Sequence, residues 1–282
     1  MMGASKEPAG MSGELSGIVR GMPDPDYRKV DAISKSGLDL IDESPRKYQH
    51  VMIEGNKPEP SAAMKLGSAF DCYLLEPEVF AKRFLVIPSG MRRGTKAWDE
   101  FEKESEGREL VKAEEFEEIK AMRDAVRAHP VASKILSDGD AQVSYFWRDP
   151  ITGLRCKARA DYRRNDGILV DVKSTADGGG KPEVFQRTAL AMRYHAQAAF
   201  YSDGAEIVDL KPAAFLFVVV ERAAPYHVAI YSMTDDFIHL GREAYRKDLE
   251  TFAACKAENV FPGYSTLIEP LSPPAWAFKK GN

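Results

Sequence analysis

Residues 156–175 read CKARADYRRNDGILVDVKST, with strand-like runs on either side of the Asn-Asp-Gly at 165–167. Asn-Asp-Gly between such runs is a strong β-hairpin signal, because these residues tolerate the backbone angles of tight turns. A three-residue loop, a type I turn closed by Gly167 in the left-handed region, places Asp161 directly opposite Asp171. Their Cβ atoms then lie ~5 Å apart. We expect the rest of the chain to be organised around this hairpin.

The loop length decides whether the two carboxylates meet. A two-residue Asp-Gly loop shifts the pairing by one residue and separates them, so both registers stay open at this point. In the three-residue register Lys173 lies on the same face as Asp171, because side chains two residues apart on a strand point the same way. Two carboxylates this close repel each other unless a cation lies between them, and a divalent metal ion is the usual cation. The alternative is a surface strand pair that carries only an Asp–Lys contact.

The segments around the hairpin alternate between helix and strand patterns. Helical segments come first, a β-meander that contains the hairpin follows, and a long helix separates it from two further strands and a final helix. That order is typical of a mixed α/β fold with a central mixed sheet flanked by helices. We expect Asp161 and Asp171 at the edge of that sheet. The expected strands are 141–148, 154–163, 168–173, 213–221 and 226–233, and the two longest helices are 182–202 and 235–258.

Length and composition are those of an ordinary globular protein. The 282 residues suffice for one large domain or two small ones, and 44% of them are hydrophobic. Residues 1–26 mix Gly, Ser, Pro and charge without a period, which predicts a flexible N-terminal arm followed by a single domain over 27–282. The net charge of -4 argues against a uniformly basic nucleic-acid binder. A local basic stripe would still suffice for DNA.

The cysteine pattern and the hydropathy indicate a compartment. The three cysteines show no paired spacing, which is typical of a reducing environment and excludes a disulfide framework. No apolar stretch reaches the ~20 residues that span a bilayer, and the N-terminus lacks a signal-peptide pattern. We therefore expect a cytoplasmic protein without a membrane partner.

Several motifs in order resemble one superfamily. Asp161 followed by Asp171-Val172-Lys173 resembles the D…(D/E)-x-K signature of the PD-(D/E)XK nucleases, which share a restriction-endonuclease-like core. Residues 153–161 (GLRCKARAD) resemble the strand that leads into the first Asp in RecE-type exonucleases, also called exodeoxyribonuclease VIII. Residues 194–201 (YHAQAAFY) carry the Q-x-x-x-Y helix motif of the RecB-like branch. Further matching motifs are SKSGL at 34–38, SP at 44–45, GSAFD at 67–71 and LEP at 75–77, so the resemblance spans roughly 27–278.

The resemblance implies a metal site. Asp161, Asp171 and the Val172 carbonyl would hold Mg²⁺ or Mn²⁺, and Lys173 would orient or help deprotonate the attacking water. Relatives usually carry His where this chain has Asp71, which is therefore a candidate third ligand or else a solvated helix acid. Many relatives also carry an acid near the position of Gln142, so this glutamine touches substrate or nothing.

Other residues are candidates for DNA positioning, two of them by the same resemblance and the rest by the charge or hydroxyl group that they carry. Gln197 and Tyr201 share a helix face with Tyr194 and would position the DNA backbone or the catalytic hairpin; the alternative is two core tyrosines with Gln197 capping a strand. Arg92, Arg93 and Arg159 are candidate DNA contacts, with a solvated loop as the alternative for the first two. Ser174 and Thr175 could donate to a phosphate, or simply end a strand.

The resemblance finally implies a function. RecE-type enzymes are Mg²⁺-dependent exonucleases of phage or prophage origin that degrade one strand of linear double-stranded DNA from its 5′ end. They pass the exposed strand to a single-strand annealing protein of RecT type, and they form homo-oligomeric rings. Two other hypotheses remain: an inactive DNA-binding or scaffolding module of the same fold, and an endonuclease.

Overall fold

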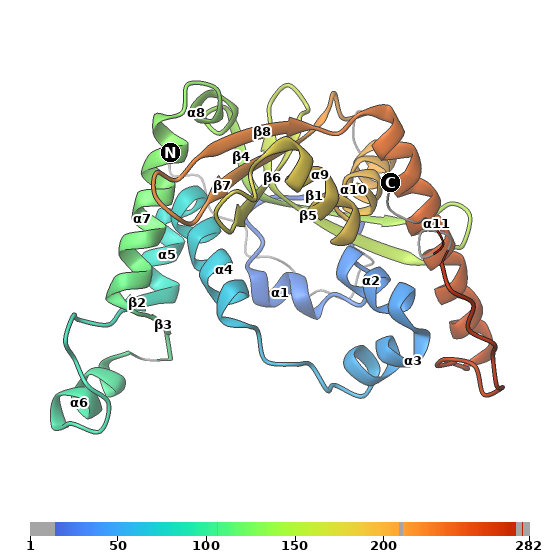
Figure 1. Cartoon of the computed structure of the whole chain (residues 1–282), viewed down its shortest axis with the longest axis horizontal. Coiled ribbons are helices and arrows are strands. Elements are labelled where there is room, and N and C mark those ends of the chain that lie inside the picture. Colours follow the sequence, from blue (N-terminus) through green and yellow to red (C-terminus); the bar gives the residue numbers. More distant parts are fainter. Residues whose placement is uncertain (1–14, 106, 209–210, 275–277, 279–282) are drawn as a thin grey trace, which may run out of the picture.

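Six strands of this chain form one mixed sheet in the order β1-β4-β5-β6-β7-β8 (Figure 1). The computed structural model describes residues 15–105, 107–208, 211–274 and 278. The strands of the sheet are β1 (Gly17–Val19), β4 (Gly139–Arg148), β5 (Arg155–Arg164), β6 (Leu169–Thr175), β7 (Phe215–Glu221) and β8 (Val228–Ser232), and a separate parallel pair consists of β2 (Phe84–Val86) and β3 (Glu109–Val111).

The helices cover both faces of the sheet (Figure 1). They are α1 (Asp24–Lys29), α2 (Lys35–Glu43), α3 (Pro45–Tyr48), the π-helix η1 (Gln49–Ile53), α4 (Ala62–Leu75), α5 (Pro77–Arg83), α6 (Lys96–Glu104), α7 (Ala113–Ala128), α8 (Ala132–Ile135), α9 (Pro182–Ala191), α10 (Tyr194–Val208) and α11 (Asp235–Glu258). This is the mixed α/β architecture, with a central mixed sheet flanked by helices, that the sequence predicts.

The hairpin strands lie in the middle of the sheet. β5 pairs with β4 and β6, while β6 pairs with β7 on its other side. The β6–β7 pair is parallel and the other neighbouring pairs are antiparallel. The chain runs from β6 to β7 through α9 and α10, which is the helical crossover that a parallel pair requires. The expected position of Asp161 and Asp171 at the edge of the sheet is therefore wrong: both belong to inner strands.

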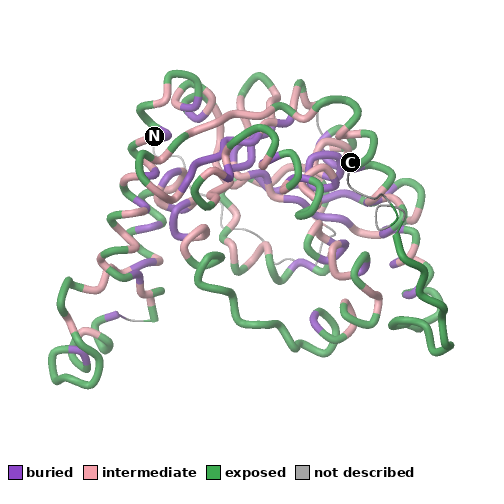
Figure 2. The backbone as a smooth tube through the Cα atoms, in the orientation of Figure 1, coloured by how far each residue is buried: buried purple, intermediate pink, exposed green. Residues whose placement is uncertain are grey.

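Two hydrophobic cores form, one on each face of the sheet, and buried residues follow the strands and the inner sides of the helices (Figure 2). On one face, α2, α10 and α11 pack on large side chains such as Tyr145 and Phe217. On the other face, α4, α5 and α7 pack on Val170 and Val218. Strand residues of alternating parity enter the two cores, because successive side chains point to opposite faces.

The expected helix over 182–202 is in fact two helices. The break falls between α9 and α10, where Arg193 has a φ of 56°, in the left-handed region that ends helices. The Arg193 guanidinium forms ion pairs with Asp39 and Asp42 of α2 and with the buried Asp248 of α11. Three acids on two other helices thus stabilise a bend that helical periodicity does not reveal.

Part of the expected flexible arm 1–26 is ordered. Residues 17–19 pair with Ser144–Phe146 of β4 as strand β1, and α1 begins at Asp24. The prediction of a flexible segment is therefore wrong for residues 15–26, while residues 1–14 lie outside the described residues. Residues 22–30, which we call the strap, contain α1 and lie beside β5, whose Lys157 and Arg159 side chains donate hydrogen bonds to their backbone.

The segment 84–111 forms an arm. Strands β2 and β3 pair in parallel at its base, and α6 projects away from the sheet at its tip (Figure 1). The basic loop before α6 carries Arg92 and Arg93, both exposed, and the Arg93 guanidinium lies 5.1 Å from the centre of the Trp98 ring.

Cys72, Cys156 and Cys255 are buried free thiols. In the described part of the chain, no helix combines the length and the apolar character needed to cross a membrane.

Candidate active site

The hairpin has the predicted three-residue loop. The Arg164 amide donates to the Ile168 carbonyl at 2.9 Å across the loop 165–167, and Gly167 has a φ of 87°. Tyr162 pairs with Val170, so Asp161 and Asp171 occupy the next opposed positions. Beyond that pair β5 and β6 separate, while β6 stays paired with β7 as far as Thr175. The two acids therefore lie where the middle of the sheet opens.

The neighbouring strand is kinked at the same level. The ladder between β4 and β5 passes from Ala141–Tyr162 to Val143–Ala160 without pairing Gln142 with Asp161. The first pair packs in the core beneath α4 and α7, and the second in the core beneath α10, so the alternation of both strands breaks between them. Gln142 has a φ of 50°, which is uncommon for any residue but glycine. The kink turns its side chain toward Asp161, to which it is hydrogen-bonded.

Asp171 lies beneath the opening rather than on the surface. It is 3% exposed, and its Oδ1 accepts a hydrogen bond from the Gln197 side chain of α10. Its Oδ2 lies 2.6 Å from the Lys173 amine, yet accepts no hydrogen bond of ordinary geometry from the described residues. Asp171 is therefore shielded from solvent, with Gln197 at one oxygen and Lys173 at the other.

The other two acids face each other across the opening. Asp161, whose Oδ2 accepts from the Val172 amide at 2.8 Å, lines a cavity together with Asp71 of α4. Burial and the neighbouring Asp171 raise the pKa of Asp161 to about 7, against the pull of Lys173, Val172 and Gln142. Burial, Asp161 and Asp171 raise the pKa of Asp71 well above its usual range. Without a bound cation, both carboxyls therefore favour their protonated forms more than an exposed aspartate does.

Lys173 is the cation within this group. Burial favours its neutral form, but the carboxylates of Asp171 and Asp161 outweigh burial and raise the pKa of Lys173. Its amine lies 4.7 Å from the centre of the Tyr194 ring, which also lines the cavity. The lysine is therefore protonated at neutral pH, which suits it to orienting water or phosphate oxygens and not to removing a proton in this state.

Helix α10 presents one face to the hairpin, as its spacing predicts. Tyr194 covers Lys173, Gln197 holds Asp171, and the Tyr201 hydroxyl is hydrogen-bonded by the backbone of Arg159, two residues before Asp161. Tyr201 also packs in the core against Phe215. The contact of Gln197 with Asp171 fits a role in positioning the hairpin. Tyr201 fits both interpretations, because its ring packs in the core and its hydroxyl is bound to the backbone of β5.

The cavity has a volume of about 1070 Å³ and collects several of the predicted residues. Its lining includes Asp71, Asp161, Val172, Lys173, Ser174 and Arg159. Thr175 instead packs beside Gly179, where an added Cβ would lie 2.0 Å from its Oγ1. Arg92 and Arg93, on the basic loop of the arm, do not line this cavity. The structure therefore gathers most of the predicted site and leaves Thr175 and the arm arginines outside it.

The donor set fits a hard divalent cation. All candidate ligands are oxygen atoms of buried carboxyls or of the backbone, which Mg²⁺ and Mn²⁺ prefer. Among the described residues, however, no three His, Cys, Asp or Glu side chains are already arranged to share one ion. Asp171 is engaged by Lys173 and Gln197. The chemistry of the site fits a metal, and its side chains would have to rearrange to bind one.

The fold and the site together define a class. A mixed sheet that opens between two central strands, with Asp161 facing Asp171-Val172-Lys173 across a hairpin, is the arrangement of the PD-(D/E)XK superfamily. The family model described as "PDDEXK-like domain of unknown function (DUF3799)" matches residues 34–272, and the chain belongs to this family.

One solved structure is similar over nearly the whole chain. A crystal structure from Eubacterium rectale, described as "Putative exonuclease", has a TM-score of 0.58 and 17% sequence identity, with 90% of this chain and 97% of that chain covered. At this identity the likeness shows a common fold. No curated protein matches the chain.

The sequence does not predict the contributions that Gln142 and the strap make to the site. Gln142 contacts Asp161 through a backbone conformation that no residue propensity indicates. The strap lines the cavity with Asp24 and Arg28, although its sequence reads as part of a flexible arm. A signal for the strap does exist, because Pro23 and Pro25 with Asp24 and Asp26 are typical of a helix N-terminus.

Proposed function

We propose that this protein is a Mg²⁺- or Mn²⁺-dependent exodeoxyribonuclease of RecE type that degrades one strand of linear double-stranded DNA in the 5′ to 3′ direction. The observation that carries the proposal is the group of Asp161, Asp171 and Lys173 at the opening of the central sheet, in a chain of the PDDEXK-like family. The raised pKa of Asp161 supports it, because a buried cluster of carboxylates with perturbed pKa values in a cavity is typical of a functional site.

Each residue of the group has a role in this proposal. Asp161, Asp171, Asp71 and the Val172 carbonyl hold the metal. When bound, the metal supplies a more acidic attacking water and charge stabilisation at the leaving oxygen. Lys173, protonated and covered by Tyr194, holds a phosphate oxygen or the attacking water. The Gln197 side chain holds the Asp171 carboxylate in position by a hydrogen bond.

Release of acid-soluble nucleotides from linear duplex DNA tests the proposal. We expect release with Mg²⁺ or Mn²⁺ and none with EDTA. Substrates labelled at the 5′ or the 3′ end give the polarity, and a covalently closed circle of the same sequence is the matched control. Cleavage of the circle would make the enzyme an endonuclease. No release from either substrate in Mg²⁺ or Mn²⁺ would refute the enzyme.

A specific observation favours a second candidate. Asp171 is engaged by Lys173 and Gln197, and the described residues contain no ready three-ligand metal group. A DNA-binding or scaffolding module that retains the fold without catalysis would have this arrangement. DNA binding that is equally strong in EDTA and Mg²⁺, with no nucleotide release, would support the module over the enzyme.

The proposed activity implies an assembly and a partner. We expect a homo-oligomeric ring, whose inner surface would gather basic residues such as Arg92 and Arg93 of the arm around duplex DNA. We also expect a RecT-type single-strand annealing protein to receive the exposed strand, and a phage or prophage origin. Light scattering of the purified chain tests the ring.

A further inference from the structure

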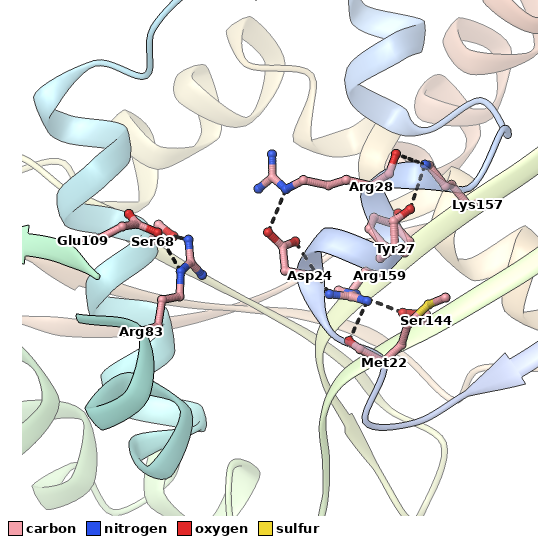
Figure 3. A network of polar contacts seen from close by, with 10 residues as sticks. All are labelled: Met22, Asp24, Tyr27, Arg28, Ser68, Arg83, Glu109, Ser144, Lys157 and Arg159. Carbon is pink, nitrogen blue, oxygen red and sulfur yellow. Dashed lines mark hydrogen bonds and ion pairs between the residues drawn. The ribbon is translucent and has the colours of Figure 1, made fainter. Parts of the chain in front are cut away.

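The strap is fastened to β5 at both of its ends. The buried Lys157 amine donates to the backbone carbonyls of Val30, Tyr27 and Arg28 at 2.7, 3.0 and 3.4 Å, at the end of α1 (Figure 3). The Arg159 guanidinium donates to the Met22 carbonyl at 3.0 Å at the other end. These contacts hold the backbone of the strap in place beside the cavity.

The strap brings an acid to two arginines at the cavity wall. The Arg28 guanidinium donates to Asp24 Oδ2 at 2.7 Å, and Arg159 lies 3.7 Å from Asp24 Oδ1 (Figure 3). All three residues line the cavity that contains Asp161. The Arg159 side chain is 9% exposed, whereas that of Arg28 is 69% exposed. Asp24 therefore lies between a buried arginine and an exposed one.

Arg159 lies close to the acid Asp161 along the same strand. Arg159 and Asp161 are two residues apart on β5, which corresponds to ~7 Å along a strand. A DNA strand with one phosphate at Asp161 and Lys173 presents further phosphates on either side of it. Guanidinium groups are well suited to phosphate oxygens, which they bind with charge-assisted hydrogen bonds.

We infer that Arg28 and Arg159 form a binding subsite for a phosphodiester group of the DNA strand, and that Asp24 fills this subsite in the free protein. The inference deepens the proposed function, on which it rests. Asp24 neutralises the two arginines until a phosphate replaces it, so it weakens the affinity for DNA. Rotation of the Asp24 side chain is enough for the exchange, because the backbone of the strap is held by Lys157 and Arg159.

The chain offers a matched control. Asp26 lies on the same short helix, is 46% exposed and pairs with Lys29 at 3.4 Å, but does not line the cavity. Asp24→Asn and Asp26→Asn change the net charge equally. The affinity of each variant for a linear duplex is measured by fluorescence anisotropy with Ca²⁺ in place of Mg²⁺. Isothermal titration with inorganic phosphate, without DNA or metal, is the second measurement.

We expect Asp24→Asn to bind DNA about threefold to fivefold more tightly than the wild type, and Asp26→Asn to differ from it by less than about 1.5-fold at physiological salt. Phosphate should bind Asp24→Asn more tightly as well. Equal affinities of the two variants, or weaker binding by Asp24→Asn, would overturn the inference. The phosphate measurement reports on the subsite even if the wild type cleaves no DNA, so failure of the nuclease and failure of the subsite give different results.

Discussion

Two buried aspartates of this protein each lie beside a cation, but the cation beside Asp171 is shared with two further acids. Asp149, directly after β4, accepts hydrogen bonds from Arg246 at both oxygens. Its Oδ2 also accepts hydrogen bonds from the amide and the hydroxyl of Thr152. Burial alone would raise the pKa of Asp149, but Arg246 and Thr152 outweigh burial and hold it below its usual range. Asp171 is equally buried, at 3% exposed, and its Oδ2 lies 2.6 Å from Lys173, which also acts on the carboxyls of Asp161 and Asp71.

The difference lies in how the surrounding acids are compensated. Asp149 and Arg246 form a pair in which the arginine and Thr152 hold the pKa of the acid low, as in an ion pair that stabilises a fold. Around Asp171, burial and the convergence of three acids on one lysine raise the pKa values of Asp161 and Asp71. A group of acids that the fold leaves under-compensated has the electrostatics of a cation site.

The largest expected effect comes from exchanging one acid of each group for its amide. Asp161→Asn should reduce nucleotide release by at least about 10³-fold, since it removes a charged metal ligand. Its melting temperature at pH 8 should stay equal or rise, because a poorly compensated buried charge is lost. Asp149→Asn should cost roughly 3 kcal/mol of unfolding free energy, because Arg246 loses its buried partner, while the residual folded protein keeps its activity.

Nuclease assays and urea unfolding of both variants check this contrast. If Asp149→Asn lost activity without losing stability, or Asp161→Asn unfolded the protein, the division between a structural and a functional acid would be wrong.

The next effect concerns pH. The pKa of Asp161 is raised from an ordinary value of 3.8 to about 7, so the folded state without metal binds a proton that the unfolded state releases. The stability that this proton supports is fully present below pH 3.8 and is lost as the pH rises toward about 7. A cation held by this carboxylate would take the place of the proton. Mg²⁺ should therefore raise the melting temperature more at pH 8 than at pH 5.5, relative to EDTA.

The pH dependence can be assigned to one residue. In Asp161→Asn the difference between the two Mg²⁺-induced shifts should shrink, whereas Asp149→Asn should retain it, measured by differential scanning fluorimetry. If Mg²⁺ shifted the melting temperature of the wild type equally at pH 5.5 and pH 8, the group with the raised pKa would not take part in metal binding.

The sequence predicts those parts of the site that depend on short-range chemistry. The loop 165–167 follows from Asn-Asp-Gly, and the face shared by Tyr194, Gln197 and Tyr201 follows from helical spacing. These features depend on residues close together in the chain, where turn chemistry and periodicity act. The fold class followed from the order of the elements, and the family match agrees with it.

The missed features depend on contacts between distant segments. The bend at Arg193 depends on acids of α2 and α11, and Asp24 of α1 meets Arg159 of β5, which is far from it in the chain. The depth of Asp171 was missed because alternation indicates a face but not what covers it. The kink at Gln142 exchanges the faces of two strands at once, which a strict period of two excludes.

The smallest expected effect tests that kink. At a φ of 50°, a non-glycine side chain costs about 1 kcal/mol, which glycine would recover. Gln142→Gly should therefore unfold at an equal or higher urea concentration than Gln142→Ala, which keeps the strained backbone and loses the same side chain. Both variants should release nucleotides about tenfold more slowly than the wild type, because both lose the hydrogen bond to Asp161. Mn²⁺ binding by calorimetry should weaken in parallel. If the strained backbone serves to position Gln142 against Asp161, the glycine variant should be at least as stable as the alanine variant and equally impaired in activity. A glycine variant with wild-type activity and metal affinity would show that the backbone conformation, and not the glutamine side chain, places Asp161.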